Sequence, residues 1–323
     1  MLKKIHRRAC LALAGLAGLV LAGSALAADP SRVTIVVPYP PGGLADIVAR
    51  LTGKVLAQNM GVPVIVENKP GANGVLGLQA IAHATPDGAT IGLVPASVLT
   101  VNPWLYKDMK VDTLKDVLPL TLAVTLPNVL VVNRDLPVKN LDDLVAYLRK
   151  TPNVNFGSMG TGSSAHLNGE MLQRSTGVTL THVPYKGSGA VMQDLMGGNI
   201  QMAFENLPLA LPLIQSGKLR AIGVTSAAVS PQAPEIPPIS TAVPGMVDQI
   251  WFGFIAPRGL PKDVASRLHD QLVRALQSDE VGVPIRERGA NITPSTPEAM
   301  QKVIVDERGH WQKLIAERNI SIN

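Results

Sequence analysis

Residues 33–50 combine a short apolar run, a cluster of prolines and glycines, and an apolar stripe at helical spacing. The run 33–37 is β-branched and suits a buried strand, because it is too short for a helix. Three prolines at positions 38 to 41 cannot continue a central strand, since proline has no N–H for the ladder. Gly42 and Gly43 then permit backbone angles and close approaches that side chains would block. The stretch predicts a strand, a Gly-rich turn and a helix N-terminus, where free N–H groups favour an anion.

A second stretch of the same kind, residues 154–170, places a Gly/Ser/Thr turn between a short strand and a helix start. Strand and helix signals alternate along the chain, which predicts α/β structure with mainly parallel sheets and right-handed crossovers. Two anion-friendly turns in one chain predict two lobes with a ligand between them. We expect one lobe from residues 28–127 and 251–323, with the C-terminal helices packed on it, and the other from residues 128–250.

Residues 1–27 have the pattern of a secretory signal peptide, with a basic start, an apolar middle and an Ala-Leu-Ala cleavage site. The mature chain is therefore expected to begin at Ala28 in the periplasm. General secretion is favoured over the twin-arginine route, because the Arg7-Arg8 pair lacks the usual flanking residues. The single cysteine, Cys10, lies in this leader, so the mature chain has no thiol for disulfides, nucleophilic catalysis or metal binding.

Removal of the leader changes the charge balance of the chain. Four of the 29 Lys and Arg residues lie in it, which leaves 25 against 24 acids and gives no argument for nucleic-acid binding. No other run of about 18 apolar residues occurs, so the mature chain is expected to be soluble. Aromatic residues make up 3% of the sequence, too few to suggest stacking platforms for bases or sugars.

Parallel α/β sheets place ligands beyond the carboxyl ends of their strands, where both turns stand. The first turn offers backbone donors, with Asp46 as a helix cap rather than a ligand contact. The second turn has more hydroxyl side chains than capping alone requires. His166 is interpreted first as a packed helix residue. Lys186, after the next strand, either neutralises a ligand carboxylate or is a solvated surface lysine.

Motifs for enzymatic chemistry are weak or missing. Residues 160–165 match the G-x-G-x-x-A dinucleotide pattern, but the acid expected about 20 residues later is absent. The chain contains no G-x-S-x-G, Walker A or H-E-x-x-H motif, and its six histidines are scattered. We therefore expect no cofactor, no metal and no enzyme, while an exported dehydrogenase or hydrolase is kept as the alternative.

Several blocks together resemble one family of receptors. These are residues 36–50, 66–71, 86–88, 157–167, 182–187, 194–198 and 251–254. In this order they are similar to the tripartite tricarboxylate transporter receptors, the Bug-type periplasmic binding proteins. The resemblance implies a Venus-flytrap fold with two lobes joined by two crossing strands. It also implies capture of a small carboxylate for integral membrane transporter subunits, or alternatively for a membrane sensor protein.

The resemblance and the strand-end argument together select the candidate ligand-binding residues. These are Tyr39, Pro41, Gly42, Gly43, Leu44, Asp46, Ser97, Ser158, Thr161, Gly162, Ser163, Ser164, His166, Tyr185, Lys186, Glu205 and Asn206. The chain departs from the family where an Asp and a small residue usually stand, at Glu205 and Asn206, and where a Glu is usual, near Thr241. The first departure bears on ligand choice. The family's ligands include amino acids, dicarboxylates, citrate and aromatic acids, of which a small aliphatic carboxylate is favoured. We expect a monomer.

Overall fold

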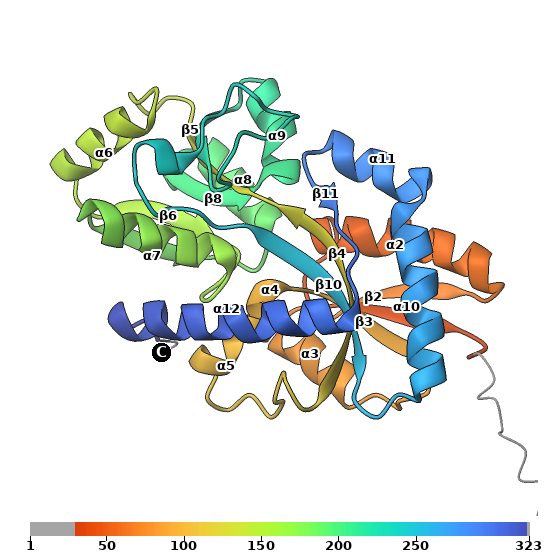
Figure 1. Cartoon of the computed structure of the whole chain (residues 1–323). Helices are drawn as coiled ribbons and strands as arrows, with labels where there is room; N and C mark the ends of the chain where they lie inside the picture. The colour runs from red at the N-terminus through yellow and green to blue at the C-terminus, as the bar shows by residue number, and fades with distance from the viewer. Residues whose placement is uncertain (1–29, 322–323) are drawn as a thin grey trace, which may run out of the picture.

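The computed structural model describes residues 30–321, so the predicted leader lies outside the described residues. The described chain forms two lobes, each built from one sheet covered by helices (Figure 1). The first sheet has the strand order β11-β4-β10-β3-β1-β2, and the second has the order β7-β6-β8-β5-β9. The predicted two-lobed α/β fold is confirmed.

Strands and helices alternate through most of the described chain, as the sequence signals predict. The strands are β1 (Val33–Val37), β2 (Val64–Asn68), β3 (Thr90–Pro95), β4 (Val117–Leu126), β5 (Asn128–Asn133), β6 (Val154–Ser158), β7 (Leu180–Pro184), β8 (Met202–Asn206), β9 (Leu219–Val224), β10 (Ile250–Pro257) and β11 (Asn291–Ile292). The α-helices are α2 (Leu44–Met60), α3 (Val75–Ala82), α4 (Ala96–Thr100), α5 (Asn102–Leu105), α6 (Leu141–Lys150), α7 (Ser164–Thr176), α8 (Ser188–Met196), α9 (Leu207–Gln215), α10 (Lys262–Gln277), α11 (Asp279–Glu287) and α12 (Pro297–Glu317).

Both sheets are mixed rather than mainly parallel, which corrects one detail of the prediction. In the first sheet β1 pairs in parallel with β2 and β3, whereas β10 runs antiparallel to β3 and β4. In the second sheet β6 pairs in parallel with β7 and β8, whereas β5 runs antiparallel to β8 and β9. β5 and β10 are the strands that directly follow the two passages between the lobes, so the βαβ alternation cannot set their direction; the short β11 also pairs antiparallel with β4.

The two passages between the lobes lie side by side. The first is a single proline, Pro127, between β4 in one sheet and β5 in the other. The second is the segment between β9 and β10, which returns to the first sheet. Backbone and hydroxyl groups join the lobe-2 ends of these passages, because Thr225 N donates to Asn128 O at 2.8 Å and Thr225 Oγ1 accepts from Asn128 N at 2.9 Å.

The C-terminal helix α12 extends across both lobes. It leaves the first lobe and runs beneath α7 of the second (Figure 1). Its last turns bury Trp311, Leu314 and Ile315 in the core that contains β6 and α7. Arg318 also pairs with Glu170 of α7 at 3.0 Å. The sequence analysis did not anticipate this contact with the second lobe. No helix within residues 30–321 has the length and hydropathy needed to span a membrane.

Candidate ligand-binding site

A cavity of about 400 Å³ lies between the lobes, where the carboxyl ends of strands from both sheets meet. The first lobe contributes residues 39–45, 95–97 and 101 to its wall, which follow β1 and flank the end of β3. The second lobe contributes residues that follow β6, β7 and β8. A third group comes from the return passage and α12, namely Asp248, Gln249, Ile250, Phe252, Glu307 and Trp311.

The first Gly-rich turn presents unpaired backbone N–H groups to this cavity. Gly43 is the N-cap of α2 and has no side chain to cap it. Within the described chain the N–H groups of Gly43, Leu44 and Ala45 have no hydrogen-bond acceptor, and all three residues line the cavity. The turn depends on Gly42, which has φ +84°. Gly43 has an extended backbone with φ −77°, so positive-φ freedom is needed only at Gly42.

Asp46 holds this turn in place from behind. Its carboxylate accepts hydrogen bonds from Gly42 N, Arg50 Nε and Asn68 Nδ2, each at 3.0 Å. Burial works against the charged form, yet the hydrogen bonds from Arg50, Gly42 and Asn68 hold the pKa of Asp46 below its ordinary value. The side chain does not line the cavity. It has the capping role that the sequence analysis ranked first.

The helices α7 and α8 of the second lobe also begin at the cavity. Ser163 is the N-cap of α7, and its hydroxyl accepts a hydrogen bond from His166 N at 3.3 Å. Helix α8 begins after Gly187 without a side-chain cap, and the N–H groups of Ser188, Gly189 and Ala190 have no acceptor in the described chain. Because residues 187–190 all line the cavity, α8 adds a further set of donors for an anion.

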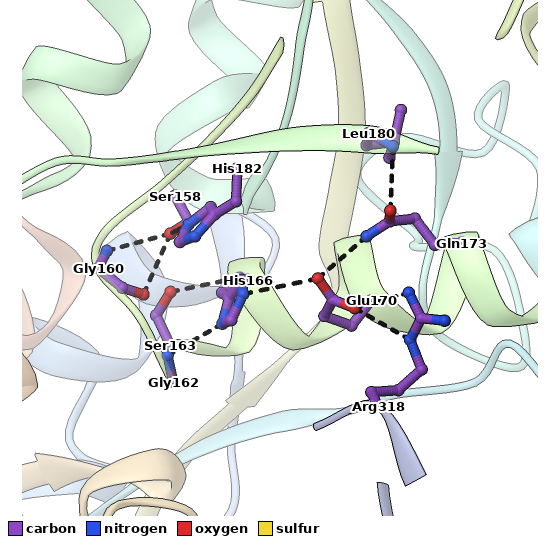
Figure 2. A network of polar contacts seen from close by, with 10 residues as sticks. All are labelled: Ser158, Gly160, Gly162, Ser163, His166, Glu170, Gln173, Leu180, His182 and Arg318. Atoms are coloured by element: carbon purple, nitrogen blue, oxygen red, sulfur yellow. Dashed lines mark hydrogen bonds and ion pairs between the residues drawn. The ribbon is translucent and has the colours of Figure 1, made fainter. Parts of the chain in front are cut away.

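A buried polar network supports the second turn from the side away from the cavity (Figure 2). Ser158 Oγ lies 2.6 Å from His182 Nε2, and it also accepts a hydrogen bond from Gly160 N. Gly162 N donates to His166 Nδ1 at 3.1 Å. The two imidazole rings stack with centroids 4.0 Å apart. Burial lowers the pKa of His166 to about 3 and that of His182 to about 4, so both rings are neutral at physiological pH.

The network continues from the turn to the end of the chain. Because Nδ1 of the neutral His166 ring accepts a hydrogen bond, its proton is on Nε2, which faces Glu170 at 3.7 Å. Glu170 in turn pairs with Arg318, just beyond α12 (Figure 2). The turn that carries Ser163 and Ser164 is thus linked through α7 to a helix that originates in the other lobe.

Ten of the predicted residues lie together in the cavity wall. They are Tyr39, Pro41, Gly42, Gly43, Leu44, Ser97, Ser163, Ser164, Lys186 and Asn206. Lys186 is exposed at the rim and forms no ion pair with any described residue.

The other seven predicted residues do not line the cavity. They are Asp46, Ser158, Thr161, Gly162, His166, Tyr185 and Glu205. Ser158, Gly162 and His166 belong to the supporting network, and the Tyr185 hydroxyl donates to Asp194 Oδ2 at 2.6 Å. Glu205 is fully buried behind the wall, where desolvation raises its pKa to about 7. One of its oxygens accepts from Asn206 N, and the other has no partner in the described chain.

The sequence analysis missed two parts of the wall. Residues 187–190 could have been found with the strand-end rule, because they follow β7 as the other turns follow β1 and β6. The residues of the return passage and of α12 could not have been found in this way, since no local pattern shows that a C-terminal helix reaches the cavity. Within residues 30–321 no group of His, Cys, Asp and Glu has the arrangement of a metal site.

Comparison with known proteins places this geometry in a family. Residues 48–320 match the model of the tripartite tricarboxylate transporter family receptor. Protein BugT of Bordetella pertussis is 35% identical over 311 residues, with 95% of this chain and 94% of BugT covered. The structure of the periplasmic binding protein BugD is 31% identical with a TM-score of 0.86, covering 91% of this chain and 100% of BugD. R. palustris Rpa4515, solved with adipate, is 33% identical with a TM-score of 0.87, covering 91% of this chain and 99% of that one.

Proposed function

Because the chain belongs to the tripartite tricarboxylate transporter family of receptors, we propose that it captures a small carboxylate between its lobes and delivers it to the membrane subunits of such a transporter. The observation that carries this proposal is the convergence of α2 from one lobe and of α7 and α8 from the other on one cavity. A carboxylate held by free N–H groups and helix dipoles needs no cationic partner, because these fixed dipoles compensate its charge. The adipate bound to the relative Rpa4515 supports a carboxylate ligand.

Capture by two lobes gives the ligand a way to change the shape of the protein. A ligand that contacts the Gly43 turn and the Ser163 turn together stabilises the closed arrangement over an open one. The hinge consists of Pro127 and the return passage before β10, which the Asn128–Thr225 hydrogen bonds hold side by side. The closed form is then the one that the membrane subunits recognise. In this role the protein is a receptor and performs no reaction.

Export follows from the same role. BugD, a relative of known structure, is a periplasmic binding protein. The leader predicted in residues 1–27 fits this location, and we expect the mature N-terminus at or near Ala28. N-terminal sequencing of protein from the periplasmic fraction tests this expectation, and an intact Met1 in that fraction would contradict it.

The function is tested by identifying what the protein carries. We expect a native mass spectrum of gently purified protein to show a co-purified small acid, and calorimetry to show that this acid binds the ligand-free protein. A panel of unbranched dicarboxylates is the first set of probes if nothing co-purifies. The proposal is wrong if a co-purified ligand has no carboxylate, or if no carboxylate of any class binds.

A further inference from the structure

On one side of the cavity, three side chains have oxygen atoms that can accept a hydrogen bond or interact with a positive charge. Asn206, Asp248 and Glu307 all line the cavity. Among the described residues no Lys or Arg forms an ion pair with Asp248 or Glu307. The helix N-termini on the other walls supply donors, so the cavity has donors for one group of a ligand and acceptors for another.

A chain of three asparagines determines which atom Asn206 presents. Asn206 Nδ2 donates to Asn128 Oδ1 at 2.9 Å, Asn128 Nδ2 donates to Asn168 Oδ1 at 2.7 Å, and Asn168 Nδ2 donates to Asp248 Oδ2 at 2.7 Å. A carboxylate can only accept, so Asp248 fixes the direction of the whole chain. Asn206 therefore uses its amide nitrogen within the chain. Its Oδ1 has no partner among the described residues, although the side chain is only 2% exposed.

Asp248 has an unused oxygen as well. Glu307 Oε1 accepts a hydrogen bond from Trp251 Nε1 at 2.7 Å, and Asp248 Oδ2 accepts from Asn168. The side chains of Trp311 and Thr100 are further hydrogen-bond partners of Glu307, whereas the other carboxylate oxygen of Asp248 has no partner within the described chain. Burial, together with the charge of Asp248, raises the pKa of Glu307 to about 7, and burial also raises the pKa of Asp248. A second carboxylate of a ligand placed here would add to this repulsion, whereas a cation would relieve it.

Aromatic rings contribute to the same wall. Phe252 and Trp311 line the cavity together with the two acids. The negative faces of aromatic rings attract cations, so rings and carboxylates together suit an ammonium group better than a second anion.

We propose that the ligand is a carboxylate that also carries a protonated amine, with the amine received by Asn206, Asp248 and Glu307. The inference rests on the proposed function and narrows its substrate class. The ligand carboxylate binds at the helix N-termini, and the ammonium compensates the charge of the two acids. Binding is specific because a ligand without a donor leaves the buried Asn206 oxygen unsatisfied and does not compensate the two acids.

The inference gives a pH dependence with a definite sign. The acid pair consists of Asp248 and Glu307. The other titratable groups around it are His310 of α12, and Tyr39 and Lys186 at the other walls. The ammonium group of a bound ligand stabilises the ionised forms of Asp248 and Glu307, so binding releases a proton from them. An amino acid ligand therefore binds more tightly as pH rises from 6 to 8. A dicarboxylate is repelled by the ionised acids, so its affinity falls over the same range.

The test is calorimetry on the full mature chain with three matched series of unbranched probes. These are α,ω-dicarboxylates, ω-amino carboxylates and ω-hydroxy carboxylates of four to eight carbons. We expect an amino carboxylate to bind most tightly. We also expect Asp248→Asn and Glu307→Gln each to weaken it about tenfold or more, while the matched dicarboxylate binds as well as before or better. Both replacements keep an acceptor for their protein donor, and thermal unfolding checks that each variant is folded.

The control variant is Glu298→Gln, an exposed acid in the first turn of the same helix as Glu307, which should change no affinity. Tighter binding of a dicarboxylate or a hydroxy carboxylate than of every amino carboxylate overturns the inference but leaves the proposed function in place. Unchanged amine affinity in both acid variants overturns it as well. Failure of all three series to bind overturns the proposed function itself and the inference with it.

Discussion

Filling the space in front of the first turn should abolish capture without unfolding the protein. A Cβ at Gly43 would have only Pro40 O within 4 Å, at 3.8 Å, and its backbone angles suit any residue. Gly43→Val therefore costs little in the fold, about 1 kcal/mol from the poorer N-cap. Its methyl groups would occupy the space that a carboxylate needs to reach the N–H groups of Leu44 and Ala45. Loss of two charge-assisted hydrogen bonds, at about 1.5–3 kcal/mol each, predicts binding weaker by about 10²- to 10⁴-fold.

Calorimetry with the identified ligand, beside a denaturation curve for each variant, measures both quantities. Ser164→Ala is the partner variant on the opposite lobe, where loss of one hydroxyl should cost about 1–3 kcal/mol of binding. Gly42→Val is the contrasting variant. Gly42 has a φ of +84°, which valine rarely adopts, so this replacement should destabilise the fold itself. A folded Gly43→Val protein with unchanged affinity, together with unchanged affinity in Ser164→Ala, would place the ligand elsewhere and refute the two-turn site.

Three further changes probe the charges and the packing around the cavity. Lys186→Met should weaken carboxylate binding by no more than about fivefold and reduce its salt dependence, because the side chain is exposed at the rim; titrations at two salt concentrations check this. Asp46→Asn should lower stability by about 1–3 kcal/mol at pH 7. Since the folded pKa of Asp46 is depressed, its stabilisation is present above the ordinary carboxyl pKa and is lost as pH falls through the folded one, so denaturation curves of variant and wild type should converge at pH values below the ordinary carboxyl pKa. Gly169→Ala should cost about 1–3 kcal/mol of folding stability, because its methyl would overlap the Phe156 ring; an unchanged melting temperature would contradict this packing.

Local sequence patterns were sufficient to predict a strand or helix wherever one short segment determines that element. The β-branched run before three prolines becomes β1, and the Gly/Ser/Thr turn within residues 154–170 lies between β6 and α7. The polar residue Asn140 caps α6, with its side chain accepting from Asp143 N at 2.8 Å. Short elements were missed, namely α4, α5, α11 and β11, because tertiary packing rather than periodicity decides pieces of this length.

Prediction of the cavity lining was right for some residues and wrong for others for the same physical reason. A strand end followed by a Gly-rich helix start is a local pattern, so the turns at Gly43 and Ser163 were found from sequence. Hydroxyl and imidazole side chains near such a turn can face the ligand or support the turn from behind. The sequence could not separate these roles for Ser158 and His166, because the deciding contact with His182 depends on how β6 and β7 pair.

The positions of the acceptor residues depend more on the topology of the fold than the positions of the two turns do. Asn168 and Asp248 stand 80 positions apart, and Asn128 and Asn206 stand 78 apart, yet each pair shares one hydrogen bond. Taken singly, each is an ordinary polar residue near a strand or helix end, and no spacing in the sequence links them. The hinge brings them together, since β5, the return passage and α7 meet there. Asp248 N also donates to Thr225 O at 2.9 Å, so Asp248 is held to the second lobe together with Asn206. The asparagine chain that orients the acceptor for the ligand is therefore also connected to the hinge that the ligand must close.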